Sequence, residues 1–137
     1  MNYLVDSNIF LEILLTQEKS QEAQDALSTI ERNSFFVTDF TLHSVGVRLF
    51  REESFDKFRQ MMSEMIDDVG LIILSLHTED TEQIIYHAQR FNLDFDDSYQ
   101  YTVSEKHDLQ IVSFDTDFDR TERGRKTPGQ VLEGLQR

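Results

Sequence analysis

Apolar residues along this chain follow two alternating patterns. Short apolar runs such as NYLV and LIIL predict strands at residues 2–5, 35–37, 71–74 and 109–114. Between these runs, apolar residues recur every three or four positions, which predicts helices at residues 7–16, 20–32, 41–52, 54–68, 77–91 and 96–107 and a last helix from Thr127–Pro128. Short buried strands that alternate with helices are typical of a parallel sheet. We therefore expect a three-layer α/β fold, in which helices cover both faces of a central parallel sheet of four or five strands.

The composition is that of one globular domain. The 137 residues contain no internal repeat, low-complexity segment or linker, so we expect a single domain over residues 1–137. No apolar run approaches the ~18 residues of a membrane span, and the N-terminus lacks the pattern of a secretion signal. The chain has no cysteine, which excludes disulfides and thiolate metal sites. Together these features predict a cytoplasmic protein that does not enter the membrane.

The charge of the chain limits the ligands that it can bind unaided. With a formal net charge of −13, the protein repels nucleic acid at long range. A protein of this composition that acts on nucleic acid needs a local basic patch, bound cations or a basic partner. The alternative is that the acidity only keeps the protein soluble.

Acidic residues collect where the predicted strands end. Ligands of an open parallel sheet bind beyond the carboxyl ends of its strands, so residues that follow the strands are candidates for a site. These residues are Asp6 after the first strand, Thr38 and Asp39 after the second, and Asp115, Asp117 and Asp119 after the fourth. The helix that leads into the fourth strand begins at DFDDS, which adds Asp94, Asp96 and Asp97. We expect these segments, which are far apart in sequence, to meet at one edge of the sheet.

Clustered carboxylates favour a divalent cation. In a half-buried cleft their mutual repulsion raises their pKa values unless cations lie between them. Oxygen ligands select Mg²⁺ or Mn²⁺, and such ions activate water for phosphodiester cleavage. Each acidic group also has a purely structural interpretation. Asp6 suits a helix N-cap, residues 94–97 suit the first turn of a helix, and residues 115–119 suit a polar turn.

Two stretches of this chain together resemble the PIN domain family, of the kind found in VapC-type toxins. The first is LVDSNIFLE, and the second is FDDSYQYTVSEKHDLQIVSFDTDFD, which ends in Ser113-Phe114-Asp115-Thr116-Asp117-Phe118. The strand–helix order agrees over essentially the whole chain. The resemblance implies a PIN-like fold and a metal-dependent endoribonuclease that uses Mg²⁺ or Mn²⁺ on an RNA substrate. It also implies membership of a toxin–antitoxin pair, with an antitoxin protein as partner.

The resemblance assigns roles to individual residues. Asp6, Asp97 and Asp115 match the metal-binding acids, and Asp117 matches a further ligand or the base that orients water. These four are therefore the expected catalytic residues. The expected supporting residues are Ser7, Asn8, Ser44, Asp96 and Ser113.

One position departs from the family pattern. PIN nucleases carry a glutamate on the helix after the second strand, and the corresponding stretch FTLHSVGV has Ser44 there. Losing a carboxylate weakens the affinity for cations, although Asp39, Asp96 or Glu12 could substitute. The second interpretation is therefore a PIN-like domain that binds RNA or a protein without cleavage. A third, a phosphoryl-transfer domain, is disfavoured because position 8 is Asn where such phosphatases carry a second Asp.

A basic stretch follows the last acidic cluster and is the candidate RNA-binding surface. It contains Arg120, Arg123, Arg125 and Lys126. Arginine suits phosphate because its planar fork pairs with two oxygens, but these arginines could instead pair with nearby aspartates. Arg48 and Arg51 are a weaker second candidate. Surplus apolar surface on the predicted helices could pair two copies of the chain or accept an antitoxin.

Overall fold

The computed structural model describes residues 1–135. In this range the strands are β1 (Asn2–Val5), β2 (Ser34–Thr38), β3 (Ile72–Leu74) and β4 (Gln110–Val112). The α-helices are α1 (Ser7–Leu14), α2 (Ser20–Leu27), α3 (Asp39–Arg51), α4 (Phe55–Gln60), α5 (Thr81–Phe91), α6 (Phe95–Lys106) and α7 (Pro128–Leu135). A π-helix, η1 (Met61–Asp68), continues α4, and two 3-10 helices occur at η2 (Thr78–Asp80) and η3 (Thr116–Arg120).

The sheet is parallel throughout and has the strand order β3-β2-β1-β4. Leu4 at the centre pairs with Phe36 on one side and with Ile111 on the other. Beyond β4 the chain returns for a single parallel bridge between Val112 and Lys126. The four strands confirm the expected α/β architecture.

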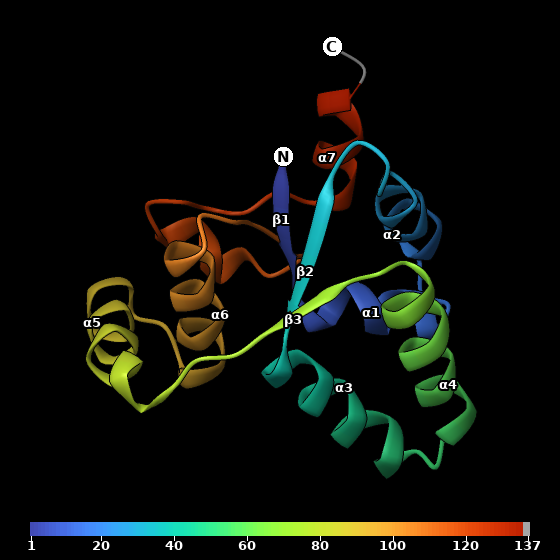
Figure 1. Ribbon diagram of the computed structural model, residues 1–137, viewed down its shortest axis with the longest axis horizontal. Coiled ribbons are helices and arrows are strands. Elements are labelled where there is room, and N and C mark those ends of the chain that lie inside the picture. The colour runs from blue at the N-terminus through green and yellow to red at the C-terminus, as the bar shows by residue number, and fades with distance from the viewer. Residues whose placement is uncertain (136–137) are drawn as a thin grey trace.

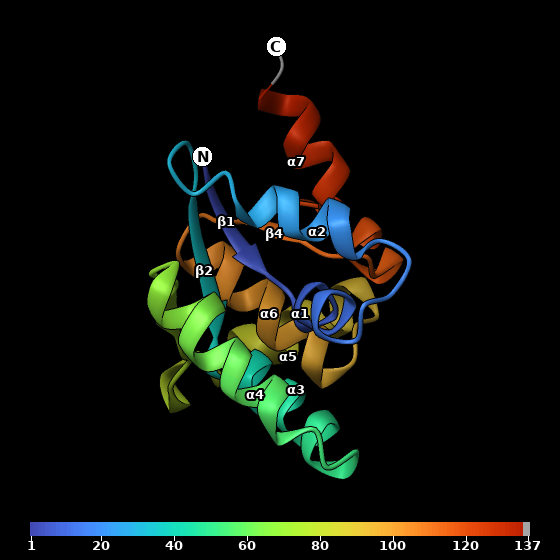
Figure 2. The same ribbon diagram turned by 90° about the vertical axis from the view of Figure 1, so that its right-hand side faces the viewer.

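Helices cover both faces of the sheet, as Figure 1 and the rotated view in Figure 2 show. Helices α5 and α6 lie on one face, and α1, α2 and α4 lie on the other. Helix α3 begins directly after β2 and extends beyond the carboxyl end of that strand (Figure 1). The carboxyl edge of the sheet is therefore bordered by the first turns of α1, α3 and α6.

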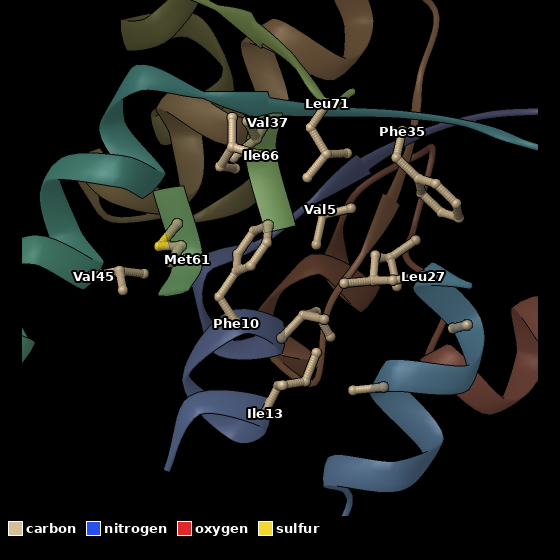
Figure 3. Close-up of a cluster of buried hydrophobic side chains, with 14 of the residues drawn as sticks. Val5, Phe10, Ile13, Leu27, Phe35, Val37, Val45, Met61, Ile66 and Leu71 are labelled. Carbon is tan, nitrogen blue, oxygen red and sulfur yellow. The ribbon is translucent and has the colours of Figure 1, made fainter. Parts of the chain in front are cut away.

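Alternation along the strands divides the core in two. Tyr3 and Val5 of β1 face the cluster under α1, α2 and η1, whereas Leu4 faces the cluster under α5 and α6. Figure 3 shows the larger cluster, in which Phe10 of α1 lies among side chains from β1, β2 and η1. Residues on successive strand positions point to opposite faces, so each buried strand contributes to both cores. Because both faces of the strands are buried, the register between neighbouring strands is fixed. The register in turn fixes where each strand ends relative to its neighbours.

The boundaries of some elements differ from those predicted. The helix expected over residues 20–32 ends at Leu27, because the hydroxyls of Ser28 and Thr29 donate to the carbonyls of Asp25 and Ala26. The helix expected over 77–91 is divided into η2 and α5, and η3 was not predicted. Within residues 1–135, no helix is both long and apolar enough to cross a membrane.

Gly70 provides a test of the fold, because its backbone has a φ of 79° between η1 and β3. A Cβ there meets no atom within 4 Å, so the cost of Gly70→Ala comes from the backbone alone. We expect this substitution to lower the free energy of unfolding by about 1 kcal/mol, measured by urea denaturation. Gly134 in α7 has equally open space but no positive φ, so Gly134→Ala is the matched control and should not destabilise. Equal stability of the two variants would contradict the prediction.

Candidate metal centre

A polar pocket of about 240 Å³ lies at the carboxyl edge of the sheet. Within residues 1–135, six carboxylates line it, and no lysine or arginine does. The acidic residues are Asp6, Asp94, Asp96, Asp97, Asp115 and Asp117, and the others are Ser7, Asn8, Phe40, Ser44 and Gln100. The structure thus places all four expected catalytic residues around one cavity.

Three of these carboxylates form the tightest group. Asp97, Asp115 and Asp117 each offer an oxygen, and these oxygens all lie within 4.8 Å of one another. Asp97 stands in the first turn of α6, where Asp94 caps the helix by accepting a hydrogen bond from the Asp97 amide at 3.0 Å. Asp115 caps η3 by accepting from the Asp117 amide at 2.9 Å. Helix capping therefore holds both sides of the group in place.

Burial and repulsion make the charge on Asp97 costly. Burial raises the pKa of Asp97 to about 8, and repulsion from Asp115, Asp94, Asp6 and Asp117 contributes to the increase. Among residues 1–135, no amide or side chain donates a hydrogen bond to the Asp97 carboxylate. The ionised form of Asp97 is therefore disfavoured near neutral pH and would be stabilised by a nearby positive charge.

Asp6 is held differently from the other acids. It is only 7% exposed, and its Oδ1 accepts hydrogen bonds from the Ser7 amide at 2.8 Å and from Gln100 Nε2 at 3.1 Å. Its Oδ2 accepts from Ser113 Oγ at 2.7 Å and from Asn8 Nδ2 at 3.4 Å. Burial raises the pKa of Asp6, although these hydrogen bonds act in the opposite direction. Asp6 caps α1, as its structural interpretation expects, and also anchors a network, while its role as a metal ligand stays a prediction.

Asn8 and Ser113 connect the ends of β1 and β4. Asn8 Nδ2 donates to Ser113 Oγ at 3.0 Å, and Asn8 Oδ1 accepts from the Phe114 amide at 3.2 Å. Ser113 Oγ in turn accepts from the Asp115 amide at 2.9 Å. The network that begins at Asp6 therefore positions the backbone of Asp115.

Gln100 is the main polar residue of the site that the sequence did not reveal. It is 3% exposed, its Nε2 also donates to Thr41 Oγ1 at 2.6 Å, and its Oε1 accepts from Thr38 Oγ1 at 2.7 Å. It thereby ties Asp6 to the end of β2 and the start of α3. The available signal was helical spacing, because Gln100 lies one turn beyond Asp96 and Asp97 and so faces the same way.

The structure separates the candidates that could replace the missing glutamate. Ser44 and Asp96 both line the pocket. Asp39 is exposed outside it and accepts a hydrogen bond from the Tyr99 hydroxyl at 2.8 Å. Glu12 lines a neighbouring hollow and accepts from the Lys19 amide at 2.8 Å. Of the three acids proposed as substitutes, only Asp96 is in position, and burial and repulsion from Asp94 raise its pKa.

The basic stretch is engaged within the chain. Arg120 pairs with Asp117 at 3.1 Å and donates to the carbonyls of Phe91 and Asn92. The other two arginines pair with Asp108 and Asp119, through Arg123 at 2.8 Å and Arg125 at 3.1 Å. Lys126 joins β4 through its backbone. Contact of these residues with RNA stays a prediction, since each of the three arginines already pairs with an aspartate that competes with phosphate.

The donor set of the pocket fits a hard divalent cation. Three carboxylate oxygens within 4.8 Å of one another match the ligands that Mg²⁺ and Mn²⁺ prefer. At the same place, burial and repulsion between carboxylates raise the pKa of Asp97. Asp97, Asp115 and Asp117 are the residues that would hold such an ion.

Comparison with known proteins gives a family and a fold. The family model described as PIN domain matches residues 3–124. A search with the sequence among curated proteins finds no match. Among solved structures, PAE2754 from Pyrobaculum aerophilum has a TM-score of 0.68 and 16% identity over 100% of this chain and 97% of that chain. VapBC2 from Rickettsia felis, bound to a DNA fragment from its promoter, has a TM-score of 0.70 and 12% identity over 92% of this chain and 97% of that chain.

The pKa of Asp97 predicts how stability depends on pH. The unfolded carboxyl loses its proton near 3.8 and the folded one near 8, so the folded state binds more protons between these values. Without divalent cations the melting temperature should therefore fall, by at least about 3 °C between about pH 5 and about pH 8. The gain in melting temperature from Mn²⁺ should grow over the same range, because binding requires ionised Asp97.

Two variants control this measurement. Asp97→Asn should flatten most of the metal-free slope and abolish most of the Mn²⁺ response. Asp67→Asn removes one charge from an exposed position and should leave both unchanged. A metal-free melting temperature that rises from pH 5 to pH 8 would refute the assignment of Asp97.

Proposed function

Because this chain belongs to the PIN domain family, we propose that it is an endoribonuclease that depends on Mg²⁺ or Mn²⁺. The observation that carries the proposal is the convergence of the Asp97, Asp115 and Asp117 oxygens within 4.8 Å of one another. They meet in a pocket that no lysine or arginine of the described part of the chain lines. Such an arrangement repels a phosphodiester by itself and becomes attractive to one only when a cation is bound.

The residues of the pocket divide the work. Asp97, Asp115 and Asp117 would hold the ion, and Asp117 would also orient an attacking water. A bound divalent cation supplies activation of that water and neutralises the charge that develops on the phosphate. Asp6 positions the site by accepting hydrogen bonds from Ser113 and Gln100. Ser7 and Asn8 donate the remaining hydrogen bonds to its carboxylate.

We extend the proposal to a toxin–antitoxin pair. The support is the resemblance of the motifs to VapC-type toxins and the likeness of the fold to VapBC2. An antitoxin or a second copy of the chain would have apolar surface to cover, since Val47, Phe50 and Phe55 are exposed on α3 and α4. Binding of such a partner is to be tested separately from cleavage.

A second candidate function is RNA binding without cleavage. Two observations favour it: Ser44 stands where the family carries a glutamate, and both oxygens of Asp6 are engaged by donors of the chain. With fewer charges directed at the ion, cation affinity falls and chemistry slows.

Cleavage of RNA by the purified protein with millimolar Mn²⁺ tests the proposal. Asp115→Asn should reduce the rate by at least about 100-fold, as expected when several kcal/mol of transition-state stabilisation are lost. Asp67→Asn, which removes the same charge from an exposed position, should retain the wild-type rate. Asp6→Asn is a poorer probe, because Asp6 accepts from four donors and its replacement disturbs the network. Equal activity of Asp115→Asn and wild type would point to a contaminant.

Ser44→Glu tests the departure from the family pattern. A carboxylate about 4 Å from the ion contributes on the order of several kcal/mol before desolvation, so we expect at least about tenfold tighter Mn²⁺ binding and faster cleavage. Isothermal titration with Mn²⁺ measures the first effect. Ser44→Gln has the same shape without the charge and should not tighten binding. If Ser44→Glu and Ser44→Gln change the affinity for Mn²⁺ equally, position 44 has no electrostatic role.

A further inference from the structure

Three aromatic rings gather beside the acidic pocket. They belong to Phe40 in the first turn of α3 and to Phe95 and Tyr99 in the first two turns of α6. The ring centroid of Phe40 lies 5.7 Å from that of Tyr99 and 6.2 Å from that of Phe95, and Phe95 lies 6.0 Å from Tyr99. We call this group the aromatic rim.

The rim reaches both the pocket and open surface. Phe40 lines the acidic pocket, and Phe95 stands between Asp94 and Asp96, which also line it. Phe95 is 59% exposed, although it is a large apolar side chain. It also borders a second hollow, which it shares with Leu76 and Ile85, so there is room for a planar group beside its ring.

The rim is held rigidly from behind. The Tyr99 hydroxyl donates to Asp39 Oδ1 at 2.8 Å and accepts from the Leu76 amide at 2.9 Å. Asp39 Oδ1 also accepts from the Phe40 amide at 2.8 Å, so one carboxylate fixes two of the three aromatic residues. Of the three rings, that of Tyr99 is held directly by these hydrogen bonds, and it packs against both Phe40 and Phe95.

We propose that Phe40 and Phe95 form the subsite that stacks the base next to the phosphate that is cleaved. This rests on the proposed function. Every nucleobase has an apolar face that stacks on aromatic rings, and in a duplex that face is already covered by its neighbours. RNA rather than protein is the favoured occupant because the exposed ring stands between Asp94 and Asp96, which line the pocket proposed to hold a cation, and a bound cation would attract a phosphate.

Stacking on the aromatic rim would also give this acidic chain a means of binding RNA. The arginines of the basic stretch are paired with Asp117, Asp108 and Asp119, so phosphate contacts alone offer little affinity. Stacking does not depend on net charge and contributes about 5- to 150-fold in affinity for each base. Binding that relies on it should fall less steeply with salt than binding through phosphate contacts.

The test compares Phe95→Leu with Phe95→Trp. Leu keeps an apolar side chain and loses the ring, whereas Trp keeps a ring. Phe55→Leu on α4 is the matched control, because Phe55 is 44% exposed and packs against Phe50, outside the aromatic rim. Binding is measured in an Asp115→Asn background with Mn²⁺, from the quenching of 2-aminopurine placed at successive positions of an unpaired oligonucleotide. Cleavage of single strand and duplex is measured in the wild-type background.

We expect Phe95→Leu to weaken single-strand binding by at least about 5-fold, to remove the quenching at one position and to reduce the preference for single strand. Phe95→Trp should restore all three, and Phe55→Leu should behave as wild type. Unchanged binding and quenching in Phe95→Leu would overturn the inference while leaving the nuclease proposal intact. If Phe95→Leu instead alters only the oligomeric state, the rim is a protein interface and the inference is wrong. If the wild-type protein quenches 2-aminopurine on binding but does not cleave RNA, the stacking role of the aromatic rim is supported and the nuclease proposal is rejected.

Discussion

Carboxylates gathered at the carboxyl edge of the parallel sheet repel one another, and burial strengthens the repulsion because little water remains to screen it. The effect is largest at Asp97, whose pKa rises to about 8. The fold brings these carboxylates together. The two-sided burial of β1 and β4 fixes where these strands end, and the chain places an acid directly after β1 and another shortly after β4. The same repulsion destabilises the folded state without cations and would favour a cation in the proposed metal site.

A neutral hydrogen-bond network keeps the acids at this edge. Gln100, Ser113 and Asn8 all donate to Asp6, and Ser113 also accepts from the amide of Asp115. Because each donor comes from a different part of the chain, the network connects β1, α6 and the segment after β4. Asp6 is thereby better suited to positioning than to direct coordination, and the charge available to an ion lies mainly on Asp97, Asp115 and Asp117.

The arrangement of cationic and aromatic groups follows from the same acidity. In a chain with a net charge of −13, aspartates are close at hand for almost every arginine of the last loop. Those arginines stabilise η3 and the segment after it, and they are not displayed as an open phosphate-binding surface. A substrate would then be held by a cation in the pocket and by the faces of aromatic rings at its rim. Neither of these contacts requires a basic surface on the protein.

By itself, the sequence determined the order of the elements, the parallel α/β class and the acids that end the strands. Those properties depend on patterns within a few residues: apolar periodicity, and an aspartate that follows a strand or opens a helix. It did not predict where α2 stops, because the hydroxyls of Ser28 and Thr29 compete for backbone carbonyls. Only the tertiary structure decided which carboxylates share a cavity, that Gln100 joins Asp6 to α3, that the arginines pair with aspartates, and that Phe40 and Phe95 meet beside the pocket. These are contacts between segments tens of residues apart, and they depend on how helices pack on a twisted sheet, which no local pattern records.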